Sequence, residues 1–471
     1  MNVIRIYFCC FAVLLSGVAS AGQADKKAVD LVAYGDYVLT MQQGEPLIEA
    51  GAVAVVAGVI VDVGTAIDID ARYIADRVLD GENKVLMPGL VNGHTHTSMV
   101  LFRGMADDLP LMTWLQDYIF PMEGRYVDTA LVEAGTKLAC WEMIKSGVTS
   151  FVDMYFYPDV IADVAVQCGM RAIVAAPMID FPSPGFEGWD DSFEAGVAFA
   201  KRWKGRHARI TPALAPHAPY TVSEAHLSDA FEAARQLGVP VSIHVAEDQA
   251  EVDVITEKYG KSSIELLAGM GMLEQRTIAA HVVWPTDNDI AKLVGSKVGA
   301  IHNPTSNMKT GAGFSPVAKM LAAGVNVGLG TDGAASNNDL DLWQEIRMAA
   351  LIHKGKSNDP TQISAFEALD MATRMGALAV GLGDKVGELK VGMQADMIQV
   401  SLGSPRFDPL YNVISHLVYV AKSTDVVTSV VNGKLLMQDG VVRTVDIESV
   451  RTDVSKISEQ IKIDLKNRRT E

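Results

Sequence analysis

The stretch LMPGLVNGHTHTSMVLFRG (residues 86–104) places two histidines, His94 and His96, directly after an apolar run and a Pro-Gly pair. Residues i and i+2 of a β-strand point to the same side, so both imidazoles would share one face. Two interpretations fit this spacing: solvated histidines at a strand end, or half of a metal site. The positions of the other histidines in the chain decide between them.

The composition is that of a large folded protein. The chain has 471 residues, 49% of them hydrophobic and 21% charged, which is enough apolar material for a sizeable core. This length favours one large domain and a smaller one. The net charge of −17 argues against nucleic acid and against an anionic membrane surface as partners, because both bind basic patches. A small-molecule substrate and a homo-oligomer both remain compatible with it.

Residues 1–21 have the pattern of a secretory signal peptide. A basic residue, Arg5, precedes a short apolar run, and an A-S-A sequence follows at 19–21. The alternative is a buried first helix. The run is short for a membrane-spanning helix, and no later stretch is long and uncharged enough to span a bilayer. We therefore expect a periplasmic or secreted protein that is not held in the membrane after cleavage, with a cytoplasmic location as the alternative.

Signal cleavage would leave two cysteines, Cys140 and Cys168. Two cysteines in so long a chain do not make a disulfide scaffold, and neither has the C-x-x-C spacing of a zinc or redox motif. Each lies in an apolar, helix-like stretch, so we expect buried free thiols, with a single bridge as the alternative.

Short apolar runs alternate with longer amphipathic segments between residues 87 and 385. Eight such runs occur: LMPGLVNGHTH, GVTSFVDM, MRAIVAAPM, RITPALAPHAP, PVSIHVAED, TIAAHVVW, VGAIHNPTSN and VNVGLGTDG. This alternation predicts an α/β fold, a (β/α)8 TIM barrel. A doubly wound sheet is the alternative, but it would usually carry a glycine-rich phosphate turn where this chain has His-Thr-His.

Two strand-rich segments flank the predicted barrel, at residues 26–86 and 386–445, the second with an Asn-Gly hairpin signal. Chain ends usually lie close together, so we expect them to form one composite β-sandwich domain. Residues 446–471 predict an exposed, charged C-terminal helix. The insertion (residues 98–126) follows the first barrel strand and would overhang the mouth of the barrel.

The histidines gather at one end of the predicted barrel. Six of the 10 histidines in the chain end predicted strands: His94, His96, His217, His244, His281 and His302. Asp332 ends the eighth run, and Glu247 follows His244 by three residues. A barrel builds its active site from the carboxyl ends of its strands. Scattered structural histidines would have no reason to collect there, so the sequence favours a metal site.

Ligand type and spacing indicate one metal ion per subunit. Three imidazoles and a carboxylate, from His94, His96, His244 and Asp332, suit Zn²⁺, with iron as the alternative. A bound water would complete the coordination. Two-metal relatives of this barrel commonly use a carboxylated lysine at strand four, but run four here contains His217 and no lysine.

Two further groups are candidates for proton transfer. Glu247 lies next to a ligand but outside the ligand set, where it could pass a proton from the water to a leaving nitrogen. A carboxylate at the rim of the barrel is the alternative for this residue. His281, together with Asp332, could orient and deprotonate the water.

The motifs PGLVNGHTH, HAPYT, SIHVAE, HNPTSN and GTDG together resemble the amidohydrolase superfamily over roughly residues 30–440. Within it, they are similar to the branch of 5-methylthioadenosine/S-adenosylhomocysteine deaminases and triazine hydrolases. The resemblance implies a metal-bearing (β/α)8 barrel with a composite β-sandwich. It also implies hydrolytic deamination of 5-methylthioadenosine, adenosine or S-adenosylhomocysteine to the inosine analogue and ammonia. In this reaction zinc-bound hydroxide attacks the amino-bearing ring carbon.

The resemblance marks the same four metal ligands and adds substrate contacts. It implies that Glu247 protonates the ring nitrogen beside the attacked carbon and that His217 contacts the nucleoside, with Asp332 also close to it. Glu123, in PMEGRYV, matches a glutamate that holds ribose hydroxyls. Trp114 packs on the base or, alternatively, is a core aromatic of the insertion.

One departure from the family pattern bears on the substrate. Members that accept S-adenosylhomocysteine place arginines after strand three to bind its carboxylate, whereas residues 172–200 of this chain contain neither Arg nor Lys. We therefore expect nucleosides without an amino-acid tail to be better substrates.

Two alternatives remain. The first is hydrolysis of another heteroaromatic amine or chloride, such as a pterin, guanine or an s-triazine. Glu247 favours an amine, because an amine leaving group needs a proton and chloride does not. Glu123 favours a ribose. The second is an inactive binding protein that kept the fold, against which the full ligand set argues.

Overall fold

The structure is a computed structural model that describes residues 26–44 and 47–468. The predicted signal peptide lies outside the described residues. Within the described ranges, no helix has both the length and the apolar character needed to cross a membrane.

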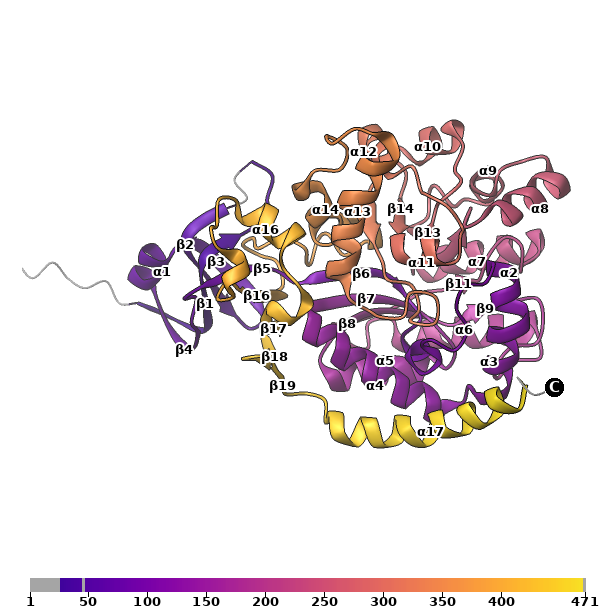
Figure 1. The fold of residues 1–471 in the computed structure, drawn as a ribbon, viewed down its shortest axis with the longest axis horizontal. Helices are drawn as coiled ribbons and strands as arrows, with labels where there is room; N and C mark the ends of the chain where they lie inside the picture. Colours follow the sequence, from indigo (N-terminus) through magenta and orange to yellow (C-terminus); the bar gives the residue numbers. More distant parts are fainter. Residues whose placement is uncertain (1–25, 45–46, 469–471) are drawn as a thin grey trace, which may run out of the picture.

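A closed barrel of parallel strands forms the centre of the described chain (Figure 1). Its strands are β6 (Leu90–Thr95), β7 (Val148–Met154), β8 (Arg171–Ala175), β10 (Ile210–Pro212), β12 (Val241–Val245), β13 (Thr277–His281), β14 (Val298–His302) and β15 (Val327–Leu329). They pair in two arcs, β10-β8-β7-β6 and β12-β13-β14-β15. A bridge between Leu214 and Val241 joins the arcs on one side. On the other side, the Asp332 amide donates to the His94 carbonyl at 2.9 Å. The predicted (β/α)8 barrel is confirmed.

Helices cover the outside of the barrel, so its strands are buried on both faces and their sequences are continuously apolar. The longer ones are α4 (Thr129–Ser146), α5 (Pro158–Cys168), α6 (Trp189–Trp203), α7 (Glu224–Leu237), α8 (Gln249–Tyr259) and α13 (Leu342–Ser357). The shorter ones are α9 (Ser263–Ala268), α10 (Asp287–Leu293), α11 (Pro304–Lys309), α12 (Val317–Ala323), α14 (Ala365–Met371) and α15 (Arg374–Val380). Cys140 in α4 and Cys168 in α5 are free, buried thiols.

The two ends of the chain form a second domain beside the barrel (Figure 1). Its N-terminal strands are β1 (Lys27–Leu39), β2 (Leu47–Val56), β3 (Val59–Thr65), β4 (Tyr73–Leu79) and β5 (Lys84–Pro88), and α1 (Ala66–Arg72) lies between β3 and β4. Its C-terminal strands are β16 (Met397–Ser401), β17 (Val426–Val431), β18 (Lys434–Gln438) and β19 (Val441–Val442). Strand β5 pairs parallel with β1 and antiparallel with β16. The composite β-domain is confirmed, and its described strands share one nine-stranded sheet.

The insertion is helical. After the 3-10 turn η1 (Thr97–Phe102) come α2 (Leu111–Thr113), the π-helical η2 (Trp114–Ile119) and α3 (Phe120–Tyr126). The C-terminal helix α17 (Ile447–Arg468) packs along α4 and extends to α3 (Figure 1). The strand pair β9 (Pro177–Met178) and β11 (Ala215–Pro216) and the helix α16 (Val413–Tyr419) complete the main elements.

Candidate active site

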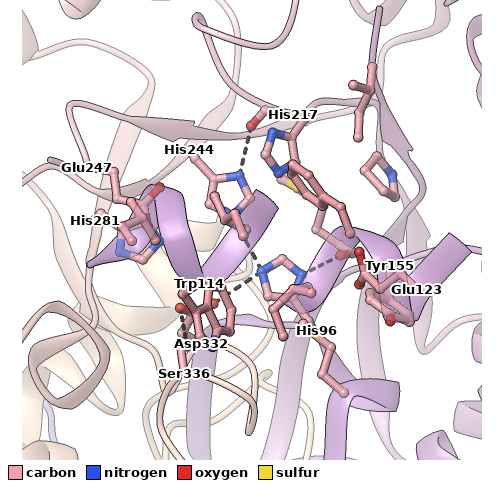
Figure 2. A pocket seen from close by; sticks show the side chains of 18 of the residues that line it. His96, Trp114, Glu123, Tyr155, His217, His244, Glu247, His281, Asp332 and Ser336 are labelled. Carbon is pink, nitrogen blue, oxygen red and sulfur yellow. Dashed lines mark hydrogen bonds and ion pairs between the residues drawn. The ribbon is translucent and has the colours of Figure 1, made fainter. Parts of the chain in front are cut away.

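A cavity lies at the carboxyl ends of the barrel strands (Figure 2). Strand ends contribute its polar side chains: His96, His217, His244, Glu247, His281 and Asp332. The insertion contributes a largely apolar wall: Met99, Leu111, Trp114, Leu115, Ile119, Phe120 and Glu123. This mixture of apolar walls with a few polar groups is typical of a small-molecule site.

Two of the imidazoles have their protonation fixed by the backbone. His96 Nδ1 lies 2.6 Å from the Met154 carbonyl oxygen, and His244 Nδ1 lies 2.8 Å from the His217 carbonyl oxygen. A carbonyl oxygen only accepts, so each Nδ1 carries the hydrogen and each Nε2 of a neutral ring has a free lone pair. These two Nε2 atoms are 3.4 Å apart (Figure 2). A cation between them could bind the lone pairs of both Nε2 atoms.

Asp332 brings a carboxylate to the same point. Its Oδ1 lies 3.3 Å from His94 Nε2 and 3.1 Å from His96 Nε2. Burial lowers the pKa of His96, but the hydrogen bond and charge of Asp332 outweigh burial and raise it to about 9. Without a metal, the cluster therefore favours a positive charge on the His96 imidazole. This preference again indicates a site for a cation.

His94 is the least accessible member of this cluster. It is fully buried, and burial lowers the pKa of its imidazole to about 4, so that the ring is neutral. Within the described part of the chain, its Nδ1 has no hydrogen-bond partner, and the contact of its Nε2 with Asp332 does not have the geometry of a hydrogen bond. Leaving such nitrogens unsatisfied is costly unless something else binds them, and a metal ion is the natural candidate.

The ligand atoms form two overlapping groups, one of His94, His96 and His244 and one of His94, His281 and Asp332. The atoms within each group lie within 4.8 Å of one another. A histidine–aspartate cluster suited to a metal ion is therefore present, and neutral imidazoles with one carboxylate fit Zn²⁺ or Fe²⁺. The structure brings the four predicted ligands together, while their individual roles stay a prediction.

Glu247 and His281 lie next to each other beside the cluster. Glu247 Oε1 lies 3.7 Å from His281 Nε2. Burial raises the pKa of the Glu247 carboxyl well above its usual range, which favours its protonated form. Asn307 Oδ1 accepts a hydrogen bond from His281 Nδ1 at 2.8 Å. The lone pair of His281 Nε2 is therefore free to accept a proton. The site thus places a carboxyl and an imidazole nitrogen side by side, and their roles in proton transfer stay a prediction.

The remaining predicted residues, His217, Glu123 and Trp114, also line the cavity (Figure 2). His217 Nδ1 bonds Thr221 Oγ1 at 2.9 Å, and burial lowers the pKa of His217 to about 3, so the ring is neutral. Glu123, on α3, lies beside Tyr155, and burial raises the pKa of its carboxyl to about 7. Trp114 is 8% exposed and forms part of the wall.

The structure also shows what the sequence analysis missed. His302 does not line the cavity; it lies behind the barrel wall with its Nε2 3.4 Å from His353 Nε2 of α13. Conversely, the hydroxyls of Ser306 and Ser336 both donate to Asp332 Oδ2, at 2.7 and 2.8 Å. Ser306 stands in the motif HNPTSN, so its place after a strand end was a usable signal.

The amidohydrolase family model matches residues 85–436. This chain belongs to the amidohydrolase family. Its relatives include the 5-methylthioadenosine/S-adenosylhomocysteine deaminase of Syntrophobacter fumaroxidans and the 5'-deoxyadenosine deaminase of Methanosarcina mazei. Each is 43% identical over 433 residues, which cover 92% of this amidohydrolase and 98% of the relative.

Among solved structures, this amidohydrolase is similar to an adenosine deaminase from Xanthomonas campestris with bound zinc. The two are 37% identical with a TM-score of 0.91, over 93% of this chain and 100% of the other. The resemblance inferred from the motifs is confirmed.

Proposed function

We propose that this amidohydrolase is a metal-dependent deaminase that converts an adenine nucleoside and water into the inosine analogue and ammonia. The observation that carries the proposal is the buried Glu247 carboxyl, which lines the cavity beside the histidine–aspartate cluster. Removal of an amino group needs a proton for the leaving nitrogen, and mere binding needs none. The deaminase names of the relatives support the same reaction.

The metal site would be built by His94, His96, His244 and Asp332, and zinc is the proposed ion, with iron as the alternative. The donor set fits both, and the zinc in the Xanthomonas structure favours the first. When bound, such a cation lowers the pKa of its water toward neutrality, so that hydroxide is available for attack on the ring carbon.

The protein's own groups then handle the protons. The lone pair of His281 Nε2 and the Asp332 carboxylate hold the attacking water and accept its proton. The Glu247 carboxyl donates its proton to the ring nitrogen beside the attacked carbon, which makes that carbon more electrophilic. The proton of the added hydroxyl then passes through the Glu247 carboxylate to the amino nitrogen, which leaves as ammonia, and the ring keeps the oxygen as a carbonyl. The proton accepted by His281 and Asp332 returns to Glu247 and restores its carboxyl.

The cavity walls would hold the nucleoside. Glu123, when ionised, can accept hydrogen bonds from both ribose hydroxyls, as the resemblance implies. His217 offers Nε2 as an acceptor, because its Nδ1–H is used by Thr221. Trp114 offers an aromatic face on which a purine can pack.

The space beside the cavity argues for nucleosides without an amino-acid tail. A second hollow shares Phe120, Glu123, Phe156 and Ile179 with the cavity and is otherwise lined mainly by residues 181–187. Within the described residues, no Lys or Arg lines it, and Glu187 adds a negative charge. A tail carboxylate would find no guanidinium there, so 5-methylthioadenosine, 5'-deoxyadenosine or adenosine should exceed S-adenosylhomocysteine in kcat/KM.

An ammonia-release assay tests the proposal. Purified protein would be offered these nucleosides alongside guanine, a pterin and an s-triazine, before and after chelation, and then with zinc or ferrous iron restored. We expect the tail-less nucleosides to react fastest, chelation to abolish the reaction and metal to restore it. Ammonia from guanine or the pterin alone, or no ammonia from the metal-loaded protein, would overturn the proposal. The exported location and the homo-oligomer stay predictions.

A further inference from the structure

The C-terminal helix α17 contacts the insertion on the side away from the cavity. Asp464 Oδ1 accepts from Arg125 Nη1 at 2.6 Å, and the Tyr126 hydroxyl donates to the Gln460 carbonyl oxygen at 3.5 Å. Arg125 and Tyr126 are the last residues of α3, the helix that carries Glu123. We propose that Asp464 is a positioning residue, which fixes Glu123 in the cavity through Arg125. This inference rests on the proposed function, because it takes Glu123 to be the ribose contact.

Helix α3 joins the two contacts rigidly. Glu123 is 5% exposed and lines the cavity, whereas the Arg125 side chain, two residues later, is 55% exposed and reaches α17. The Val127 amide donates to the Glu123 carbonyl at 3.0 Å and closes the last turn of the helix. A shift of Arg125 would therefore move the backbone of Glu123 with it.

The insertion and the end of α17 border a hollow on this side. Residues 104–107, Asp117 and Met122 line the hollow from the insertion, and Leu465 lines it from α17. The contacts of α17 with α3 bridge one edge of this hollow.

Helix α17 is itself well anchored, so it can hold α3 in place. Val450 is 5% exposed and Ile461 is 3% exposed, and both are buried against the rest of the protein. The Asp464 side chain is 11% exposed, so its charge interacts with the guanidinium through a partly desolvated contact. Such a contact couples more strongly than a fully solvated surface pair.

The test compares D464N with two matched variants. D464E keeps the charge, and D453N removes an exposed carboxylate on the same helix, whose partner Lys456 lies 3.5 Å away. We expect D464N to raise KM for 5-methylthioadenosine about three- to fivefold, with kcat and bound metal unchanged. D464E should restore most of the affinity, and D453N should behave as the parent.

Two readouts separate positioning from general damage. A 2',3'-dideoxy nucleoside offers no ribose hydroxyls to Glu123, so D464N should leave its KM unchanged. Hydrogen exchange should also show faster amide exchange in residues 120–126 of D464N but not of D453N. Equal KM effects on both nucleosides, or unchanged exchange in α3, would overturn the inference. If the parent deaminates no nucleoside, the proposed function fails, and the exchange experiment alone still decides whether α17 holds α3.

Discussion

The two ring nitrogens of His96 and of His244 have separate roles that are set by the main chain. Each Nδ1 donates to a carbonyl oxygen, of Met154 or His217, and each Nε2 faces the cluster. Many metal sites use a carboxylate for this purpose. A backbone carbonyl has no pKa in the working range, so here the tautomer stays fixed over a wide pH range.

Asp332 is oriented by side chains instead. Ser306 and Ser336 hold Oδ2, which turns Oδ1 toward the imidazoles. The double variant S306A/S336A should lower metal affinity about 10- to 100-fold, because the carboxylate loses both orienting hydrogen bonds. Competition with a chromogenic chelator measures this, and each single variant should show a smaller loss. Unchanged affinity in the double variant would contradict the role.

Glu247 should matter for chemistry and not for metal binding. E247Q should lower kcat for 5-methylthioadenosine by about 10²- to 10⁴-fold, because an amide cannot carry the proton. Metal content per chain should stay at the parental value. E257Q, an exposed change on α8, is the matched control. A variant that kept its kcat would remove Glu247 from the mechanism.

A buried acid away from the cavity should make stability depend on pH. Glu345 accepts from Thr305 N at 3.1 Å and Asn337 Nδ2 at 2.9 Å, and burial raises its pKa from 4.5 to about 7. Because the folded pKa is raised, its contribution to the free energy of unfolding is full below pH 4.5 and is lost as pH rises toward 7. The loss is on the order of 3 kcal/mol.

Urea unfolding at pH 4.5 and pH 7 measures this effect. E345Q cannot ionise, so its free energy of unfolding should change less between the two pH values than that of the parent. The amide nitrogen that E345Q introduces is itself a donor, and it would face the Thr305 N–H or the Asn337 Nδ2–H donor. The free energy of unfolding of E345Q should therefore be lower than that of the parent at both pH values. An equal pH dependence in parent and variant would show that Glu345 does not titrate in this range.

At the scale of elements, the loop after β9 offers a way to change specificity. Phe181 lines the second hollow and is 37% exposed, so it can be replaced without opening the core. F181R would supply a guanidinium for a carboxylate tail. We expect kcat/KM for S-adenosylhomocysteine relative to 5-methylthioadenosine to rise about fivefold, on the order of one charge-assisted hydrogen bond. F181L is the control, and a ratio that moves equally in both variants would refute the idea.

The insertion shows what local sequence can and cannot predict. Its position over the cavity follows from its place after the first barrel strand, and Trp114 and Glu123 lie in the cavity wall accordingly. The π-helical turn of η2 and the contact between Arg125 and Asp464 were not predicted. Both depend on packing between segments that are distant in sequence, which periodicity within one segment does not encode.

His302 illustrates the same limit at the end of a strand. Its position at the end of β14 resembles that of His281 at the end of β13. Successive side chains of a strand alternate between the interior of the barrel and the helix layer, and His302 lies on the helix side, against His353. Ala280 pairs with Ile301, so the two histidines follow equivalent register positions, and His281 departs from the alternation where its φ reaches 73°. Strand ends were predictable from apolar runs, but this local turn of the backbone was not.

For the whole molecule, one ion pair connects the barrel to the β-domain. Arg171 of β8 donates from Nε and Nη2 to both carboxylate oxygens of Asp396, at 2.8 and 3.0 Å, and both side chains are buried. R171M should lower the free energy of unfolding by about 3–5 kcal/mol, because it leaves the Asp396 charge buried without the guanidinium. R202M, which breaks an exposed pair with Asp159, should cost less than about 1 kcal/mol.

Chemical unfolding followed by circular dichroism measures both changes. A stable R171M variant would show that the two domains hold together without this pair. The barrel and the composite β-domain were predictable because their strands repeat simple patterns. The ion pair was not, since it joins residues that no sequence motif relates.

The sheet assembled from both chain ends has a consequence for biosynthesis. Strand β5 lies between β1 and β16, so its second edge acquires a neighbour only when nearly the whole polypeptide has left the ribosome. Until then, Lys84–Pro88 exposes an unpaired edge, which invites association with other nascent chains. A chaperone that shields this edge during translation would therefore matter more for yield than one that acts on the finished barrel.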